Sequence, residues 1–408
     1  MARINRVLTS PGIPGSGCSK PRRLLWNDLC LTSFPQQLDS ESTKLMHRWF
    51  FDISDALFPP QFCSKFDILK SIWVNCILAD EASSYVDFFE RRPGISSKTL
   101  CHISKAYELV NLKLSGPESV SDCAIAAVVS LAIYQQIHHQ QSTGLIHLNG
   151  LHRMIQLRGG IARLMEENRA LALKPLRLDV ELALQTGSPL FSSDALLVNA
   201  VSRDSHVIKE HLPSTAPRLP RIMLNVISFA NLLNGKEKEE RTKLDPLNYT
   251  ETLLSLLYHL IEVAPLGQPR SVSGGLYDDV AHLAMLAFMT TLLPEYGRDH
   301  SSYLLLSNRL ESAIQNLHVT YADTQHSGSS LLLWTLFISG VTVLKRKEHP
   351  WLSLLILETC ERLDLYDWPA VRRQLCGFPW VHTLHDVPGR FLWEDAQRRS
   401  IEISSKAS

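Results

Sequence analysis

The sequence predicts an all-α protein, with a single large multi-helix domain that follows a short, flexible N-terminal arm. Apolar residues recur at spacings of three and four along most of the 408 residues, which is the pattern of amphipathic helices. Sustained alternation of apolar and polar residues with many Val, Ile and Thr, which marks strands, is hard to find. Hydrophobic residues make up 45% and charged residues 20%, which is ordinary for a soluble globular protein and excludes wholesale disorder.

Residues 1–37 form the predicted arm. The first 27 residues contain five Lys and Arg and no acid, and prolines and glycines at 11–17 interrupt them. The continuous apolar stretch of a signal peptide is missing. A short basic arm of this kind serves as a nuclear address or contacts phosphates weakly. A solvated tail without a targeting role is the alternative.

The first strong helix signal is 124–133, where nearly every position is apolar, as in a helix buried on all sides. A second helix carries an apolar stripe on one face, and Gly159-Gly160 supplies the permissive backbone that helix ends favour. That stripe consists of Leu148, Leu151 and Ile155. A shorter stripe follows at Ile161, Leu164 and Met165, and we expect Pro175 to limit its extension.

Four more apolar blocks predict helices at 253–261, 280–293, 331–344 and 352–363. Three stretches are predicted as connections between helices, namely 213–220 with its three prolines, the charged run 236–243 and the Gly-containing run 267–275. None of them shifts composition enough to require a domain boundary. We therefore predict one helical domain over 38–400 and a tail over 401–408. The longest apolar stretch, 331–344, falls short of the roughly 20 residues that span a bilayer, so no membrane association is expected.

Charge and cysteine content narrow the function classes. The 41 Lys and Arg balance the 41 Asp and Glu, whereas a dedicated nucleic-acid-binding domain usually carries a basic excess. No two of the eight cysteines show the C-x-x-C spacing of zinc ribbons or redox motifs. We expect these cysteines to behave as small apolar core residues in a reducing compartment.

Enzyme motifs are mostly absent. The sequence contains no H-E-x-x-H helix, no phosphate loop ending in G-K-[ST] and no G-x-S-x-G elbow, and the glycines at 12–17 lack the Lys-Ser/Thr of a phosphate loop. The acids at 87–90 and 278–279 do not form the D-D-x-x-D pattern of class I terpene synthases, and we interpret them as polar residues flanking helices.

Three histidine pairs are candidate metal ligands because their members lie close together in the sequence. Adjacent residues 138 and 139 point to different sides of a helix, and His147 and His152 lie about 140° apart around one. His382 and His385 can share a helix face near Asp386, but a third ligand is not evident, and we interpret them as surface or capping residues. The segment 49–58 (WFFDISDALF) is interpreted as a first core helix, with an exposed acidic activation motif as the alternative.

Several motifs in the last quarter of the chain occur in a fixed order. A block rich in Leu and Trp at 331–347 contains Ser339-Gly340, and Pro350-Trp351 follows it. The next motifs are Trp368-Pro369-Ala370-Val371-Arg372, Phe378-Pro379-Trp380 and Leu392-Trp393. This succession resembles the C-terminal half of the fungal-specific transcription factor domain, the helical module of many fungal zinc-cluster regulators.

An upstream block is similar to the same family. Its motifs are His147-Leu148-Asn149-Gly150-Leu151, Arg158-Gly159-Gly160, Arg177-x-Asp179 and Pro189-Leu190-Phe191. The resemblance covers roughly 40–395. From the residues alone, Gly340 and Gly377 can end helices, Pro350 and Pro369 can start them, and the tryptophans fill a core. Arg158 and Asp179 are a candidate ion pair between neighbouring helices.

The chain departs from the family at the DNA reader. Members usually carry an N-terminal cluster of six cysteines that binds two zinc ions, but only Cys18 and Cys30 precede residue 60 here. Three explanations stay open: a truncated gene model, a natural loss of the reader, or a partner that supplies it.

The resemblance implies a transcriptional regulator or co-regulator of the nucleus that works through protein–protein contacts, tuned by an effector or not. We predict no enzyme activity, no catalytic or metal-binding residues and no cofactor, and we assign no DNA-binding residues. The expected partners are other transcription regulators, with DNA contacted only indirectly or weakly through the basic arm, and oligomer formation is left open. Two alternatives are a helical enzyme or small-molecule-binding protein with an apolar pocket, and a scaffold that pairs with a full-length regulator.

Overall fold

The computed structural model describes residues 58–64, 110–137, 140–193, 218–236, 243–268, 275–293, 303–321, 328–344 and 348–407, together with positions 104, 107, 108 and 196. Helices account for most of these residues. Within them, the one strand-like pairing is an isolated parallel bridge between Cys63 and Leu244. The predicted all-α fold is therefore confirmed for the part of the chain that is described.

The N-terminal part of the described residues contains α8 (Asp122–Ile137), α9 (Gln141–Leu157), α10 (Ile161–Glu167) and α11 (Arg169–Thr186). The middle of the chain contributes α13 (Arg218–Lys236), α14 (Pro246–Val263), α15 (Leu276–Thr290) and α16 (Leu304–Tyr321). The last four are α17 (Ser329–Val341), α18 (Trp351–Arg362), α19 (Trp368–Leu375) and α20 (His382–Ala407). Residues 39–408 form one compact unit.

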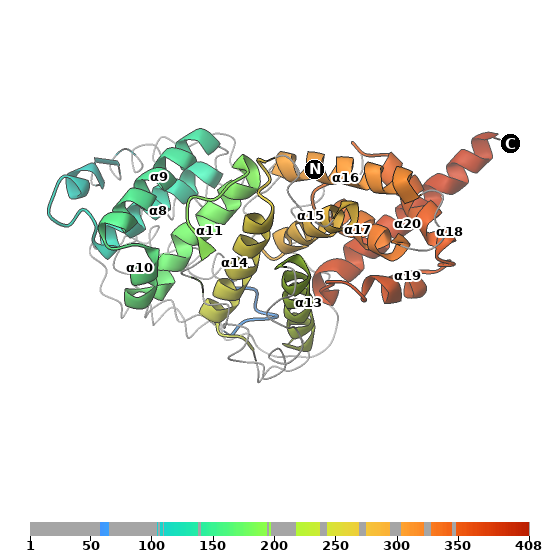
Figure 1. The fold of residues 1–408 in the computed structure, drawn as a ribbon, viewed down its shortest axis with the longest axis horizontal. Coiled ribbons are helices and arrows are strands. Elements are labelled where there is room, and N and C mark those ends of the chain that lie inside the picture. Colours follow the sequence, from blue (N-terminus) through green and yellow to red (C-terminus); the bar gives the residue numbers. More distant parts are fainter. Residues whose placement is uncertain are drawn as a thin grey trace, which may run out of the picture. The chain divides into compact units, whose positions relative to one another are not determined.

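Three helices, α14, α15 and α17, lie at the centre of the core. Every residue from Asp279 to Thr290 in α15 is buried, as is every residue from Leu332 to Ser339 in α17. α14 lies between α11 and α15, and α17 packs against α15, α16, α18 and α20 (Figure 1). Helices that are apolar on all sides belong in such a centre, because each face then meets another helix.

The helices predicted from periodicity are present. α8 covers 124–133, and eight of these ten residues are buried. The stripe predicted for α9 is buried, and the chain then turns through Gly159 and Gly160, whose φ angles are +111° and +95°. The four later blocks lie in α14, α15, α17 and α18.

One boundary prediction is wrong. Pro175 does not limit the helix that begins at Ile161, because α10 already ends at Glu167 and Pro175 lies inside α11. The new helix begins where the Asn168 side chain accepts the backbone N–H of Leu171 at 3.1 Å, which satisfies a donor that an N-terminal turn leaves free. A local cap, and not the proline, therefore decides where α10 ends.

Caps and prolines start the later helices as their residue types lead one to expect. Asp245 accepts the N–H of Asn248 at 2.9 Å at the start of α14, and Asp367 accepts the N–H of Ala370 at 2.7 Å at the start of α19. The predicted connection 213–220 is wrong at its end, because Arg218–Pro220 form the first turn of α13, where the missing N–H of Pro220 costs little.

The predicted tail over 401–408 is wrong for residues 401–407, because the C-terminal helix α20 continues to Ala407. The predicted N-terminal arm lies outside the described residues, as do 237–242 and 269–274 of the predicted connections. Among the described residues, no helix combines the length and the apolar character needed to cross a bilayer.

Candidate functional site

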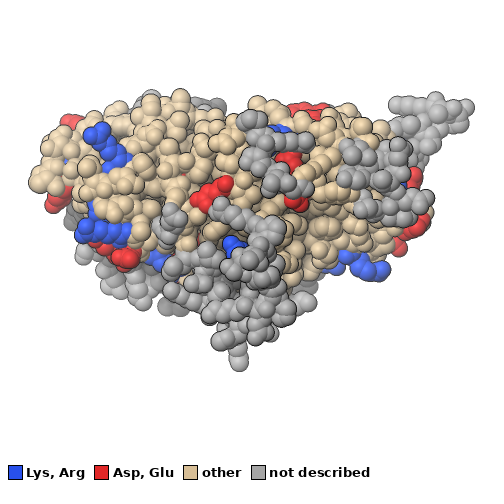
Figure 2. All heavy atoms as spheres, in the orientation of Figure 1, with Lys and Arg blue, Asp and Glu red and all other residues tan. Residues whose placement is uncertain are grey.

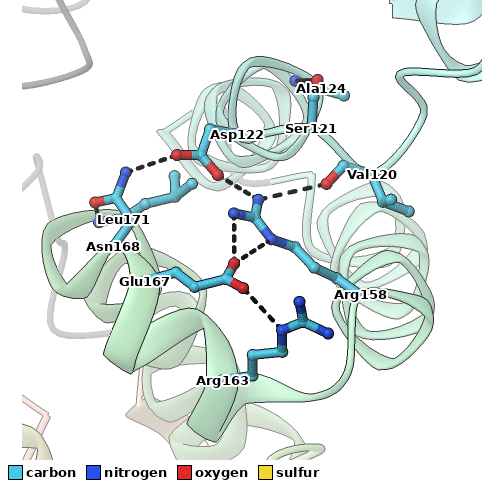
Figure 3. A network of polar contacts seen from close by, with 9 residues as sticks. All are labelled: Val120, Ser121, Asp122, Ala124, Arg158, Arg163, Glu167, Asn168 and Leu171. Carbon is cyan, nitrogen blue, oxygen red and sulfur yellow. Dashed lines mark hydrogen bonds and ion pairs between the residues drawn. The ribbon is translucent and has the colours of Figure 1, made fainter.

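Arg158 is the centre of a polar junction between the ends of three helices (Figure 3). It follows the last residue of α9, while Asp122 opens α8 and Glu167 closes α10. The guanidinium forms an ion pair with Asp122 and donates from Nε and Nη2 to Glu167 Oε2 at 3.0 and 2.8 Å. Its Nη1 also donates to the backbone oxygen of Val120 at 3.4 Å. One side chain thus connects helix ends and a segment that lies 38 positions away from it in the chain.

Two neighbours complete this junction. Arg163 donates to Glu167 Oε1 at 2.7 Å, and Asn168 donates to Asp122 Oδ2 at 2.9 Å (Figure 3). Burial by itself would lower the pKa of Arg158, but hydrogen bonds to Glu167 and Asp122 raise it above the ordinary value. Hydrogen bonds from Arg163 and then Arg158 lower the pKa of Glu167. Two guanidinium groups face two carboxylates, so the junction is a charge-balanced clamp.

The predicted ion pair between Arg158 and Asp179 is wrong. Asp179 points into the core from α11 and accepts the backbone N–H groups of Leu190 and Phe191 at 2.8 and 2.9 Å. It also accepts the hydroxyl of Tyr258 at 2.7 Å. Burial raises the pKa of Asp179, although these three donors act in the opposite direction. The carboxylate holds the segment after α11 against α14, and two blocks that carry the family resemblance meet at this point.

The C-terminal blocks meet at a second junction. Trp334 on α17 donates its indole N–H to the backbone oxygen of Pro379 at 3.0 Å. Trp380 donates to Asp386 Oδ1 at 2.8 Å, and Arg372 on α19 donates to Asp386 Oδ2 at 2.9 Å. A hydrogen bond to Asp386 raises the pKa of Arg372, although burial opposes the shift. This junction holds α17, α19 and the start of α20 together.

The buried histidine of this junction is used on both ring nitrogens. His385 Nδ1 accepts the backbone N–H of Val381 at 2.9 Å, so its Nε2 carries the hydrogen and donates to Thr291 Oγ1 at 3.1 Å. Thr291 in turn donates to the backbone oxygen of Phe288 at 2.7 Å. Burial lowers the pKa of His385 to about 3. The imidazole is therefore neutral at physiological pH and connects α20 to the end of α15.

The pair His382 and His385 is not a joint ligand set. His382 Nδ1 lies 3.1 Å from Arg372 Nη2 and 3.9 Å from Asp386 Oδ1, whereas His385 turns into the core. Interpreting both as surface or capping residues is half right, because His385 is fully buried yet accepts an amide at the start of α20. Within the described ranges, no three His, Cys, Asp or Glu side chains are grouped so as to hold a metal ion.

The histidines of α9 also lie apart. His147 Nε2 lies 3.4 Å from the Tyr107 hydroxyl, and burial lowers the pKa of His147. His152 instead packs edge-on against Phe191, with ring centroids 5.0 Å apart. Of the acids at 278–279, Asp279 is buried in the first turn of α15, 3.7 Å from Arg309 Nη2.

Two residues that contact distant segments could not be identified from the sequence. Asn234 near the end of α13 donates to the backbone oxygen of Trp380 and accepts the N–H of His382, at 2.8 and 2.9 Å. Lys174 on α11 has its ammonium 5.9 Å from the centroid of the Phe58 ring, and burial lowers its pKa to about 7. A single amide or lysine within a helix does not reveal which distant segment it will contact.

Several sequence candidates lie outside the described residues: the glycines at 12–17, Cys18, Cys30, the stretch 49–57, the acids at 87–90 and the histidines at 138–139. Comparison of the chain with protein-family models, with curated proteins and with solved structures finds no match.

Proposed function

We propose that this chain is a transcriptional regulator or co-regulator that acts in the nucleus through protein–protein contacts of its helical domain. Its partners are other transcription regulators, and its contact with DNA is indirect or weak, through the basic arm. One observation carries the proposal: the motifs that resemble the fungal-specific transcription factor domain occur in the family's order, and they lie at the helix boundaries and junctions of this fold.

The helix boundaries in the last quarter support the proposal. The resemblance implies that a helix rich in Leu and Trp ends at a small-residue turn, and α17 ends one residue after Ser339-Gly340. It implies that Pro-Trp opens the next helix, and α18 begins at Trp351 directly after Pro350. These agreements are independent of one another, since each depends on a different local sequence.

The junctions give a second line of support. Arg158, Asp179 and Trp334 each contact the backbone of a segment that is distant in the chain, namely 120, 190–191 and 379. The motif residues therefore fix the relative placement of the helices, and outward helix faces are left for other macromolecules. A protein-binding scaffold needs both a fixed arrangement of its helices and outer faces that partners can contact.

The surface charges favour protein partners over direct DNA binding. On the face in Figure 2, basic and acidic side chains of the described residues lie in small groups within a largely uncharged surface. DNA-binding surfaces usually concentrate Lys and Arg on one face, because phosphate contacts dominate affinity.

The test tethers the full chain to a foreign DNA-binding domain beside a reporter gene. We expect reporter expression to change several-fold, in either direction, relative to the foreign domain alone. A Trp334→Ala variant tests whether the effect depends on the folded domain. It removes the hydrogen bond to Pro379 and a fully buried ring, so it should reduce the change in reporter expression.

Deletion of the chain from its host is the second arm of the test. We expect a defined set of transcripts to change. A tethered chain that folds, reaches the nucleus and leaves both the reporter and the host transcripts unchanged would contradict the proposal.

A further inference from the structure

Four exposed residues of α9 are aligned on the side opposite its buried stripe. The inward face of the helix packs on α8, α10 and α11 through its buried apolar stripe (Figure 1). On the opposite side, Ile146, Gly150, Arg153 and Leu157 follow one another at spacings of four, three and four. This heptad-like spacing keeps all four on one side of the helix. We call this set the α9 face.

Both aliphatic side chains of the α9 face are open to solvent. Ile146 is 68% exposed and Leu157 is 71% exposed. A single exposed aliphatic residue is ordinary on a protein surface. Here two of them mark the ends of one straight stripe about three helical turns long, and Arg153 is the one charged residue of the helix between them.

Gly150 lies between them and is not required by the fold. It is exposed, and a Cβ built on it meets nothing within 4 Å. A glycine inside a helix costs roughly 0.5–1 kcal/mol relative to alanine. The benefit that glycine offers is close approach of another backbone. No part of this chain within the described residues uses that approach, so the space suits a helix from outside.

Arg153 supplies the charge preference of this face. It is exposed and makes no ion pair with any residue that the structure describes. α9 contains no Asp or Glu, so nothing within the helix neutralises it. A carboxylate set between apolar side chains is the complement of an unpaired guanidinium set between Ile146 and Leu157.

We propose that the α9 face is the docking surface for an amphipathic helix of a partner protein, one that places a carboxylate among apolar side chains. This inference rests on the proposed function and names the kind of partner. A second copy of the chain fits less well, because two α9 faces would bring together two Arg153 and no acid. An anionic membrane also fits less well, since stable membrane association usually takes a cluster of basic residues.

Binding of a short acidic amphipathic peptide to the full chain tests the inference. The probe is a fluorescent synthetic peptide that places two aspartates among leucine and aromatic residues at helical spacing, and its binding is measured by anisotropy. We expect Ile146→Asp and Leu157→Asp to weaken binding about tenfold or more, and Val319→Asp, on the similarly exposed Val319 of α16, to leave it unchanged.

Two further variants separate docking from folding. Gly150→Ala should raise the melting temperature of the chain and weaken peptide binding several-fold, a combination that a purely structural glycine would not give. Gly235→Ala is its control, because Gly235 is also exposed in a helix with nothing within 4 Å of its Cβ position. Arg153→Glu should weaken binding about fivefold, and a peptide with both aspartates replaced by lysine should restore it.

Three outcomes would overturn the inference: equal peptide binding by all variants, a dimer in solution that Ile146→Asp dissociates, or binding to phosphatidylserine vesicles in place of the peptide. The tethered reporter separates this inference from the proposed function. If the wild-type chain and the Ile146→Asp variant alter the reporter equally, the docking surface fails and the proposed function stands. If variant-sensitive peptide binding occurs but the reporter does not respond, the proposed function fails and the docking surface stands.

Discussion

Single buried polar residues connect distant segments of this chain, Asp179 through backbone N–H groups and His385 through the Thr291 hydroxyl. Asp179 accepts two backbone N–H groups, and His385 accepts one. Buried backbone groups need partners, and a lost partner leaves the desolvation cost uncompensated. Because a carboxylate or imidazole in such a position titrates, the free energy of unfolding depends on pH at these residues.

His385 should make the protein less stable as pH falls. Its folded pKa is about 3 while the ordinary value is 6.5, so between these values the unfolded state binds a proton that the folded state does not. The contribution is fully present above the ordinary value and is lost as pH falls toward the folded one. Between about pH 7.5 and about pH 5 the loss from this group is roughly 2 kcal/mol, at about 1.4 kcal/mol per pH unit.

Urea unfolding of the wild type and of His385→Gln at both pH values checks this prediction. Glutamine also carries one acceptor and one donor group but does not titrate, so the loss of stability on acidification should shrink by that amount. Thr291→Val is the control, because it removes the acceptor of Nε2 and leaves the imidazole in place. An unchanged pH dependence in His385→Gln would contradict the assignment.

Gly187 is a residue whose conformation and contacts both exclude a side chain. Its φ is +101°, and a Cβ built on it would lie 2.4 Å from the Cα and N of Gly267. The left-handed conformation alone costs roughly 1–2 kcal/mol for other residues, and the backbone of 267 must also move. We expect Gly187→Ala to lower the free energy of unfolding by about 2–4 kcal/mol.

Gly267→Ala is the comparison for that measurement. The φ of Gly267 is not positive, and a Cβ built on it would lie 3.4 Å from the Cα of Gly187, an ordinary contact, so this substitution carries neither cost. Urea unfolding should give a clearly larger loss for Gly187→Ala. Equal losses at the two positions would mean that neither the left-handed conformation nor the close approach at Gly187 is costly.

At the scale of helices, boundaries could be predicted where a local signal decides them. Gly159-Gly160 ends α9, and Pro350-Trp351 begins α18, because backbone permissiveness and a missing N–H act within a few residues. The boundary predicted from Pro175 is wrong, because tertiary packing of a buried helix can offset the free-energy cost of an internal proline. Apolar periodicity does not give the direction of a polar side chain either, so the predicted pair of Arg158 and Asp179 depends on opposite charge alone.

Gly340 shows how closely three helices approach. It stands in the last turn of α17, and a Cβ there would lie 2.7 Å from Leu352 on α18 and 2.8 Å from Leu392 on α20. Gly340→Ala should therefore overpack this contact and destabilise the protein by about 1–3 kcal/mol. The near atoms are the ends of flexible leucine side chains, so shortening one of them should relieve the strain.

A double-mutant cycle tests this interpretation. Leu392→Ala alone leaves a cavity and destabilises, but in the Gly340→Ala background its cost should be smaller by about 1 kcal/mol. Additive free energies would contradict a direct contact between these two positions.

At the scale of the whole molecule, the buried helices form a connected series. α11 packs on α14, α14 on α15, and α15 on α17. The junction around Arg158 and the junction formed by Trp334, Trp380 and Asp386 therefore belong to one compact unit. The apolar content of these helices made the series predictable as a core. Its order did not follow from the sequence, because a helix that is apolar on all sides shows no preference among its neighbours.

One consequence is that a substitution that destabilises the Arg158 junction should also make the C-terminal helices unfold at a lower urea concentration. Arg158→Met leaves the carboxylates of Asp122 and Glu167 without their shared guanidinium, and we expect a lower free energy of unfolding. Five of the eight tryptophans lie at or beyond residue 334, so indole fluorescence mainly follows the distant part of the unit. Far-UV circular dichroism follows all helices.

If residues 39–408 unfold as one cooperative unit, the fluorescence and circular dichroism midpoints of Arg158→Met shift together in urea. Arg163→Met is the control, because Arg163 is 62% exposed and loses only a surface pair with Glu167 four residues away on the same helix, which contributes little. An early circular dichroism transition with an unshifted fluorescence midpoint would show that α8–α10 unfold independently. In that case the helices around α9 could rearrange on binding a partner without disturbing the core, and the α9 face would act as a separate module.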